Sequence, residues 1–336
     1  MRALAALLLL ALVGCAKKSE TPQATSTAFP VGLVYDIGGR GDKSFNDAAY
    51  AGLDSAQKQL GITFSTLETN EGSDREAQLR QLAAGDNKLV FGVGFLFSDD
   101  IKNLAKEFPN QRFACIDYTW SPGDSVPANL VGLKFREEEG SFLVGALAAL
   151  TSKSGKVGFV GGMDIPLIRK FEAGYTAGAR AVNPNVVVVS KYAGTTGAAF
   201  KDPTKGQELA LAEYQDGVDV IFHASGSTGL GVFEAARKLK KLAIGVDADQ
   251  YKEAPGFILT SMVKRVDHAV FDTIRDLKAG QWQGGVREMG LAEHGVTWVY
   301  DDRNKALIPD HVKATVDSLE AEIIAGRIKV PTGMNP

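Results

Sequence analysis

Apolar runs of strand length alternate with stretches of helical periodicity along most of this chain. After the first run, for example, Phe45, Ala49, Leu53 and Leu60 recur at spacings typical of a helix. The clearest strand runs are Val31–Tyr35, Lys88–Val93, Arg112–Ile116, Lys156–Val160, Val186–Val189, Val218–Phe222 and Leu242–Val246. Repeated alternation of strand and helix predicts parallel sheets, and continuously apolar runs such as Val186–Val189 are typical of strands covered on both faces. The pattern indicates an α/β fold with doubly wound parallel sheets.

A chain of 336 residues is long enough for about two domains. The turn-rich Ser121–Pro127 segment ends the first strand series, and a second series begins at Lys156. If the extended run Phe257–Val263 crosses between the units, the helix from about Asp267 to Leu277 returns to the first unit and Thr297–Tyr300 returns to the second. The expected lobes are residues 29–134 plus 266–293 and residues 135–265 plus 294–336. Three hinge strands would let such lobes close over a cleft, as in periplasmic binding proteins; two independent domains in series are the alternative.

The N-terminus has the features of an export signal. One positive charge at Arg2 precedes the apolar run Ala3–Val13, which is shorter than the roughly 20 residues that a membrane-spanning helix needs. The run ends in Leu12-Val13-Gly14-Cys15, which resembles the lipobox of bacterial lipoproteins. We therefore expect a signal peptide over residues 1–14, a lipid on Cys15 and a polar tether over residues 15–28. These features predict an extracytoplasmic protein anchored by lipid to a bacterial membrane; an ordinary secretory signal is the alternative.

Charge and cysteine content exclude several classes of protein. The 37 Lys and Arg residues against 40 Asp and Glu residues give a net charge of -3, so the overall field does not attract nucleic acid or an anionic bilayer. Cys115, the only cysteine besides Cys15, lies in an apolar run and is expected to be a small buried hydrophobic residue. No disulfide scaffold is expected.

The predicted strands end in polar and glycine-rich segments. In open parallel sheets, ligands bind beyond the carboxyl ends of the strands. The first strand is followed by Asp36 and a glycine-rich loop with Ser44 as candidate helix N-cap, before Phe45 and Asn46. Later strand ends deliver further candidates: Asp117, Phe200, Gly226 and Asp247, with Lys264 closing the Phe257–Val263 run. Both lobes should therefore present carboxylates, small residues and aromatic rings to one cleft.

These residue types favour a neutral, planar, hydroxylated ligand. Carboxylates accept hydrogen bonds and repel phosphates, so Asp36, Asp117 and Asp247 suit hydroxyl and ring N–H groups. Phe45 and Phe200, one from each lobe, are placed to stack on a flat ring. A nucleoside fits this description. Plainer interpretations remain: Phe45 as core, the aspartates as turn caps and Lys264 as a solvated lysine.

Several segments carry a resemblance to a known family. Cys15 with its tether, Gly41-Asp42-Lys43-Ser44-Phe45-Asn46, Gly245-Val246-Asp247-Ala248-Asp249-Gln250 and Thr260-Ser261-Met262-Val263-Lys264 resemble the basic membrane protein family of purine nucleoside-binding lipoproteins. The match covers nearly all of the expected mature chain. It implies the substrate-binding component of an ABC transporter, with a transporter permease as partner and the two-lobed type I periplasmic-binding fold.

The resemblance also implies roles for individual residues. Phe45 and Phe200 would stack on the two faces of the purine, and Asn46 and Asp117 would recognise the base. Asp247 and Lys264, paired across the cleft, would hold the ribose hydroxyls. The pocket would also be lined by Asp36, Ser44 and Gly226.

One specificity follows from the chemistry of Asp117. A carboxylate accepts from both N1–H and the exocyclic amine of guanine, whereas adenine has no proton on N1 and would leave two acceptors facing each other. We therefore predict guanosine and inosine in preference to adenosine.

Motifs of other classes do not match. Gly226–Gly231 lacks the dinucleotide-binding spacing, and Asp42-Lys43-Ser44 lacks the glycine before lysine of a P-loop. The four histidines show no metal-binding helical spacing, and no Gly-x-Ser-x-Gly elbow surrounds Ser225. No catalytic residues, cofactor or metal are expected. The alternatives left open are a binding lipoprotein for a sugar or other solute, a sensor of nucleosides, and a nucleoside-cleaving hydrolase, although the dense aspartate cluster of such hydrolases is missing after Asp36.

Overall fold

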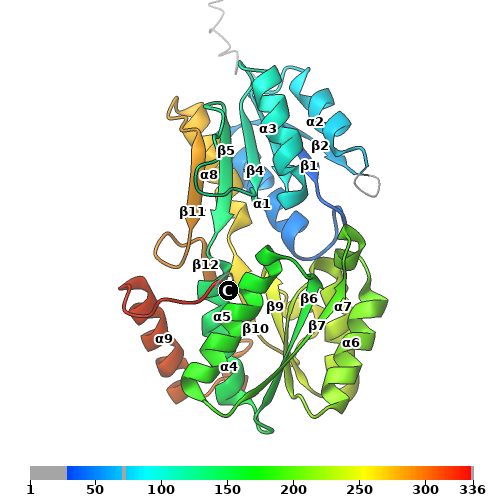
Figure 1. Ribbon diagram of the computed structural model, residues 1–336, viewed down its shortest axis with the longest axis vertical. Coiled ribbons are helices and arrows are strands. Elements are labelled where there is room, and N and C mark those ends of the chain that lie inside the picture. Colours follow the sequence, from blue (N-terminus) through cyan, green and yellow to red (C-terminus); the bar gives the residue numbers. More distant parts are fainter. Residues whose placement is uncertain (1–28, 70–72, 334–336) are drawn as a thin grey trace, which may run out of the picture.

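The computed structural model describes residues 29–69 and 73–333. The signal peptide, Cys15 and the tether, all predicted from the sequence, lie outside the described residues. The described chain forms two α/β lobes, one above the other in Figure 1.

Lobe 1 contains a six-stranded sheet in the order β11-β5-β4-β3-β1-β2, with all neighbouring strands parallel. Its strands are β1 (Pro30–Tyr35), β2 (Thr63–Glu68), β3 (Leu89–Val93), β4 (Phe113–Ile116), β5 (Leu130–Phe135) and β11 (Gly285–Met289). Its helices are α1 (Phe45–Leu60), α2 (Arg75–Ala83), α3 (Ser98–Glu107) and α8 (Val266–Lys278). Helices α1 and α8 pack closely because Gly52 has no side chain; a Cβ there would lie 2.5 Å from the Asp267 carbonyl oxygen.

Lobe 2 repeats this plan with the order β12-β10-β9-β8-β6-β7, in which only the pairing of β12 with β10 is antiparallel. Its strands are β6 (Lys156–Met163), β7 (Val187–Gly194), β8 (Val220–Ala224), β9 (Leu242–Asp247), β10 (Ile258–Lys264) and β12 (Val296–Trp298). Its helices are α4 (Glu137–Thr151), α5 (Pro166–Val182), α6 (Pro203–Gln215), α7 (Gly229–Leu239) and α9 (Asp310–Ile324).

The chain passes between the two sheets three times. It leaves lobe 1 after β5, returns between β10 and α8, and leaves again between β11 and β12. The predicted fold class, two doubly wound lobes joined by a three-strand hinge, is confirmed.

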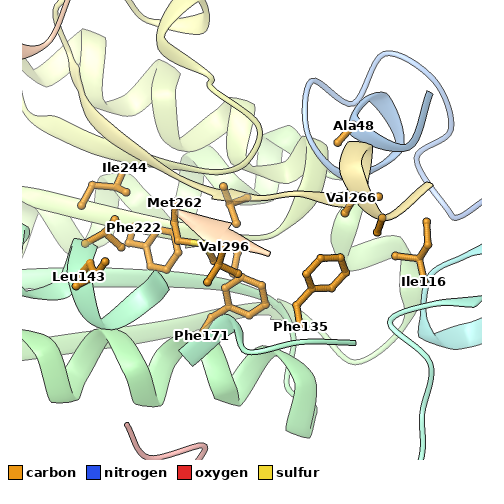
Figure 2. Packing of buried hydrophobic residues seen from close by; sticks show 14 of the residues in the cluster. Ala48, Ile116, Phe135, Leu143, Phe171, Phe222, Ile244, Met262, Val266 and Val296 are labelled. Carbon is orange, nitrogen blue, oxygen red and sulfur yellow. The ribbon is translucent and has the colours of Figure 1, made fainter. Parts of the chain in front are cut away.

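A hydrophobic core continues through this hinge. Figure 2 shows Phe135, at the end of β5, between Phe171 on one side and Ile116 and Val266 on the other. A separate cluster fills the other face of each sheet. In lobe 1 it surrounds Phe97 beneath α2 and α3, and in lobe 2 it surrounds Phe233 beneath α6 and α7. Each lobe is thus a layered unit, and the two lobes share a core where the chain crosses.

One expectation about burial is wrong. The valine run at 186–189 was expected to be covered on both faces, but β7 is the edge strand of its sheet and Val187 is 48% exposed. A run of β-branched residues favours a strand without fixing its place in the sheet, because edge and central strands share the same local preference. Position in the sheet is decided by the crossover connections.

Candidate ligand-binding site

A cavity lies between the lobes at the carboxyl ends of their strands. It holds about 590 Å³ of atom-free space, part of it open to solvent. Eight of the nine residues predicted from the sequence line it: Asp36, Phe45, Asn46, Asp117, Phe200, Gly226, Asp247 and Lys264. The ninth, Ser44, is fully buried behind the wall. The doubly wound topology therefore brings residues from distant parts of the chain to one place.

Asp42, rather than Ser44, caps helix α1. The Asp42 carboxylate accepts hydrogen bonds from the backbone N–H groups of Ser44, Asn46 and Asp47 at 2.8–3.1 Å. The Ser44 side chain makes no capping bond. Its hydroxyl instead donates to Asp247 Oδ2 of the other lobe at 2.5 Å. The expectation that the Ser44 side chain caps the helix is wrong, because a carboxylate two residues earlier satisfies those donors.

The side chain of Asn46 fixes the loop before α1. Its Oδ1 accepts from the Asp36 N–H at 3.0 Å, and its Nδ2 donates to Asp42 Oδ2 at 3.1 Å. One N–H of the amide remains available on the side chain, which lines the cavity. Asn46 therefore both shapes the wall and offers a single donor to a ligand.

Asp36 contributes a buried carboxyl to lobe 1. Its Oδ1 accepts from the Ile37 N–H at 2.7 Å, and its Oδ2 faces the space that a side chain at Gly94 would fill. Burial raises the pKa of Asp36 to about 7, although the Ile37 N–H opposes the shift. The group can therefore accept or donate a hydrogen bond near neutral pH.

Asp117 and Asp247 occupy equivalent places in the two lobes. Asp117 directly follows β4 and Asp247 ends β9, and both have left-handed backbone, with φ of 59° and 64°. Aspartate tolerates this region better than most residues. Left-handed backbone held at a site is typical of functional positions. Burial raises the pKa of Asp247 to about 7, with Lys264 and the Ser44 hydroxyl opposing the shift.

Lys264 is the centre of a buried charge cluster. Its ammonium lies 2.6 Å from Asp117 Oδ1 and 3.0 Å from Glu137 Oε1, and the side chain is 2% exposed. The ammonium also lies 4.9 Å from the ring centroid of Phe135 and 5.2 Å from that of Phe45. Burial alone would lower the pKa of Lys264, but Asp117, Glu137 and Asp247 raise it well above its usual value.

This arrangement corrects two expectations. The lysine is not solvated, and its ion pair is with Asp117 and Glu137 rather than with the predicted partner Asp247. Burial raises the pKa of Asp117 while the lysine opposes that shift. Glu137 is held ionised by Lys264 and by Lys170, which lies 2.7 Å from its Oε2.

The aromatic lining comes from both lobes. Phe45 begins α1 in lobe 1, and Phe200 ends the 3-10 helix Gly197–Phe200 in lobe 2. The Phe200 ring lies directly over Gly162 at the end of β6, where any side chain would overlap it. The site thus has one ring on each side, and Gly162 makes room for the second.

Sequence reasoning missed part of the wall. Leu167, Ile168 and Phe171 line the cavity from the start of α5, and Ser225 lines it beside Gly226. The helical spacing of Leu167, Ile168 and Phe171 in the sequence predicts an apolar helix face. The spacing does not show whether that face lines a cavity or packs in the core. Among the residues that the structure describes, no group of histidine, cysteine and acidic side chains could hold a metal ion.

The lobes are in contact across the cleft. Besides the bond from Ser44 to Asp247, Gln250 Nε2 of lobe 2 donates to the Lys43 carbonyl oxygen of lobe 1 at 3.0 Å. Ile37 packs against Gly197 of lobe 2. The conformation is therefore closed. Over the described ranges, no helix is both long and apolar enough to cross a membrane.

Comparisons with known proteins agree with this architecture. The family model described as "ABC transporter substrate-binding protein PnrA-like" matches residues 29–333. The chain is 38% identical to the CD4+ T-cell-stimulating antigen of Listeria innocua, over 94% of this chain and 91% of that protein. It is 36% identical to basic membrane protein A of Borreliella afzelii, over 90% of this chain and 91% of that protein.

A solved structure is also similar. The solute-binding protein of an ABC transporter system from Aeropyrum pernix has a TM-score of 0.83 and 30% identity, over 91% of this chain and 94% of that one. The resemblance seen in the sequence is confirmed. The chain belongs to the Bmp family of PnrA-like ABC transporter substrate-binding proteins.

Proposed function

We propose that the chain is an extracytoplasmic lipoprotein that binds a purine nucleoside between its lobes and delivers it to the permease of an ABC transporter. Guanosine and inosine are the favoured ligands, in preference to adenosine. The family model supports the general role in solute binding, and the site supports the choice of ligand.

One observation carries the choice: Phe45 of lobe 1 and Phe200 of lobe 2 line the same cavity as the carboxyls of Asp36, Asp117 and Asp247. Two rings offer stacking faces to a flat base, worth roughly 1–3 kcal/mol per stacked base. The carboxyls provide acceptors for ribose hydroxyls and for N–H groups of the base. Among the described residues that line the cavity, four aspartates outnumber the one cation, Lys264, which disfavours a phosphorylated ligand.

The base preference rests on Asp117. Both of its carboxylate oxygens lie against the Lys264 ammonium, Oδ1 at 2.6 Å and Oδ2 at 2.7 Å, and each oxygen has a second lone pair with which it can accept from a ligand. The ammonium favours the ionised carboxylate, which accepts from the N1–H of guanine and hypoxanthine. Adenine presents a bare N1 to the same oxygen and loses affinity.

The family and the N-terminal motif support the proposed cellular setting. A lipid on Cys15 and the polar tether would keep the lobes next to the transporter outside the cytoplasm. One relative is named a basic membrane protein, which agrees with this setting.

Isothermal titration with guanosine, inosine and adenosine tests the proposal. The sharpest variant is Asp117→Asn, because an amide offers one acceptor and one donor and therefore suits the N6 donor and N1 acceptor of adenine. We expect its preference to shift toward adenosine, whereas the matched change Asp124→Asn in the loop after β4 leaves the preference as it was. Wild-type protein that binds adenosine as tightly as guanosine overturns the base preference.

A further inference from the structure

His223 lies behind the cavity wall, between a lining residue and a contact that joins the lobes. Its Nδ1 is 3.3 Å from Ser225 Oγ, and its Nε2 is 3.1 Å from Gln250 Oε1. The imidazole is fully buried, and Phe233 packs edge-on at a centroid distance of 5.0 Å. A side chain at Gly229 would overlap the imidazole ring. The ring therefore has little room to move, and its two nitrogens face Ser225 and Gln250.

The amide orientation of Gln250 follows from its other partners. The Val246 N–H, which can only donate, lies 2.8 Å from Oε1, so this atom is the oxygen. The Lys43 carbonyl, which can only accept, lies 3.0 Å from Nε2, so this atom is the nitrogen. Both contacts assign the same orientation, and Gln250 therefore presents an acceptor to His223.

An acceptor at Gln250 Oε1 requires the hydrogen of His223 to be on Nε2. Burial lowers the pKa of His223 to about 4, so the ring carries a single N–H at neutral pH and Nδ1 is bare. A bare nitrogen accepts, so the Ser225 hydroxyl donates its hydrogen to Nδ1. Ser225 lines the cavity, and its Oγ then has only lone pairs to offer to a ligand.

We propose that the hydrogen-bond chain from Gln250 through His223 makes Ser225 an obligate acceptor, so that the bound ligand must donate an O–H or N–H to Ser225 Oγ. The proposal rests on the proposed function for the nature of the ligand. It adds a specificity determinant, because Ser225 Oγ would select a ligand with a hydrogen-bond donor next to it. A ligand with an acceptor in that position would place two acceptors against each other. The hydrogen-bond chain ends at the contact between Gln250 of lobe 2 and the Lys43 carbonyl of lobe 1. The orientation of the Ser225 hydroxyl is therefore connected to the closed arrangement of the lobes.

The first test is independent of any ligand. Long-range ¹H–¹⁵N correlation spectra of ligand-free protein with ¹⁵N-labelled histidine rings distinguish the two neutral tautomers, and His223 is assigned by its loss in His223→Phe. We expect a neutral ring with hydrogen on Nε2 at pH 7. Hydrogen on Nδ1, or a protonated ring, overturns the proposal without requiring any variant to bind ligand.

The second test uses inosine and analogues that each lack one of its donors. Inosine has four donors, which are N1–H and three ribose hydroxyls; 1-methylinosine removes the first, and the 2′-, 3′- and 5′-deoxyfluoro analogues remove the others. Fluorine is similar in size to a hydroxyl but cannot donate. We expect the analogue that lacks the donor to Ser225 to bind wild-type protein about tenfold or more weakly than inosine, while losses at donors that face Asp117 or Asp247 are distinguished by the variants below.

Variants show whether that loss belongs to Ser225. In Ser225→Ala the ratio between inosine and the affected analogue should fall toward one, because the opposing acceptor is gone. In His223→Phe the ratio should also fall, because the hydroxyl is free to turn and donate. A purely structural role would weaken inosine and the analogue alike. Ser190→Ala, on β7 of the same lobe and outside the cavity, should leave the ratio unchanged.

The outcomes separate the two proposals. Ratios that are the same in wild-type and Ser225→Ala protein overturn the role of Ser225 even if inosine binds. Wild-type protein that binds neither inosine nor guanosine overturns the proposed function, and the tautomer of His223 still decides whether the hydrogen-bond chain exists.

Discussion

The Lys264 ammonium lies 2.6 Å from Asp117 Oδ1, and so a residue at the end of β10 in lobe 2 neutralises a carboxylate at the end of β4 in lobe 1. Glu137, at the crossing from lobe 1 to lobe 2, contacts the same ammonium. The ion pair therefore connects the ligand cavity to the hinge. A ligand that contacts Asp117 would therefore also contact the charge cluster of Asp117, Lys264 and Glu137, which lies where the chain crosses between the lobes.

Replacing Lys264 by methionine should destabilise the protein strongly. Breaking a buried ion pair by removing one partner typically costs about 3–5 kcal/mol, because the remaining charge is left uncompensated. Here Asp117 and Glu137 would both lose their shared cation. Urea denaturation should show the loss in Lys264→Met, while Lys205→Met, which removes an exposed pair with Glu208, should change the free energy of unfolding by less than about 1 kcal/mol. Equal effects would contradict the importance of the cluster.

Gly162→Ala should weaken ligand binding through Phe200. Any side chain at Gly162 overlaps the Phe200 ring, so the ring must leave its place on the cavity wall. We expect the affinity for inosine to fall roughly five- to 150-fold, the equivalent of one lost stacking contact. Gly85→Ala in lobe 1, where the added carbon would be no closer than 3.6 Å to a neighbour, is the matched control. Full affinity in Gly162→Ala would show that Phe200 does not stack on the ligand.

Ser44→Ala should favour the open state. Its hydroxyl donates to Asp247 across the cleft, a hydrogen bond that contributes about 0.5–1.5 kcal/mol with the neutral carboxyl and about 1.5–3 kcal/mol with the ionised one. The closed population should therefore fall, which small-angle scattering of the ligand-free protein measures as a larger radius of gyration. Ser121→Ala, in the loop after β4, should have the wild-type radius. An unchanged radius in Ser44→Ala would mean that other contacts hold the lobes together.

The buried Glu213 of α6 should make stability depend on pH. Burial raises the pKa of Glu213 to about 9, against the opposing charge of Lys191, and neither carboxyl oxygen has a hydrogen bond within the described chain. The folded protein thus keeps a proton that the unfolded chain releases above about pH 4.5, so stability falls as pH rises from about 4.5 to 9.

Glu213→Gln should flatten the part of that profile between pH 7 and 9, measured as the free energy of unfolding. Glu208→Gln, an exposed change on the same helix, should keep the wild-type slope. A wild-type slope in Glu213→Gln would show that another group controls this pH range.

The sequence predicts the fold class well because central strands are continuously apolar. Val31–Tyr35 and Leu242–Val246 are such cases, and both become inner strands of their sheets. Strand β11, by contrast, alternates half-buried and exposed residues at the edge of lobe 1, and no apolar run marks it. Its place is decided by pairing with β5, a tertiary contact that local patterns do not contain.

The candidate site shows the same division. Strand ends deliver Asp117, Asp247 and Phe200 to the cavity, which follows from topology alone. Topology alone does not predict which charged groups pair. Lys264 has acidic groups from both lobes within reach, and the closed geometry selects Asp117 and Glu137. The contact between His223 and Gln250 is not predictable either, because no local pattern connects residues 27 positions apart.

The most direct test of the account is a calorimetric titration of the purified protein with guanosine, inosine, adenosine, cytidine and ribose, repeated with Phe45→Ala. The account predicts one ligand per chain for guanosine and inosine, weaker binding of adenosine, no binding of cytidine or ribose, and a loss of affinity of roughly five- to 150-fold in Phe45→Ala, as expected for one stacked base. Binding of ribose without purine nucleosides, or release of a free base from them, would contradict it.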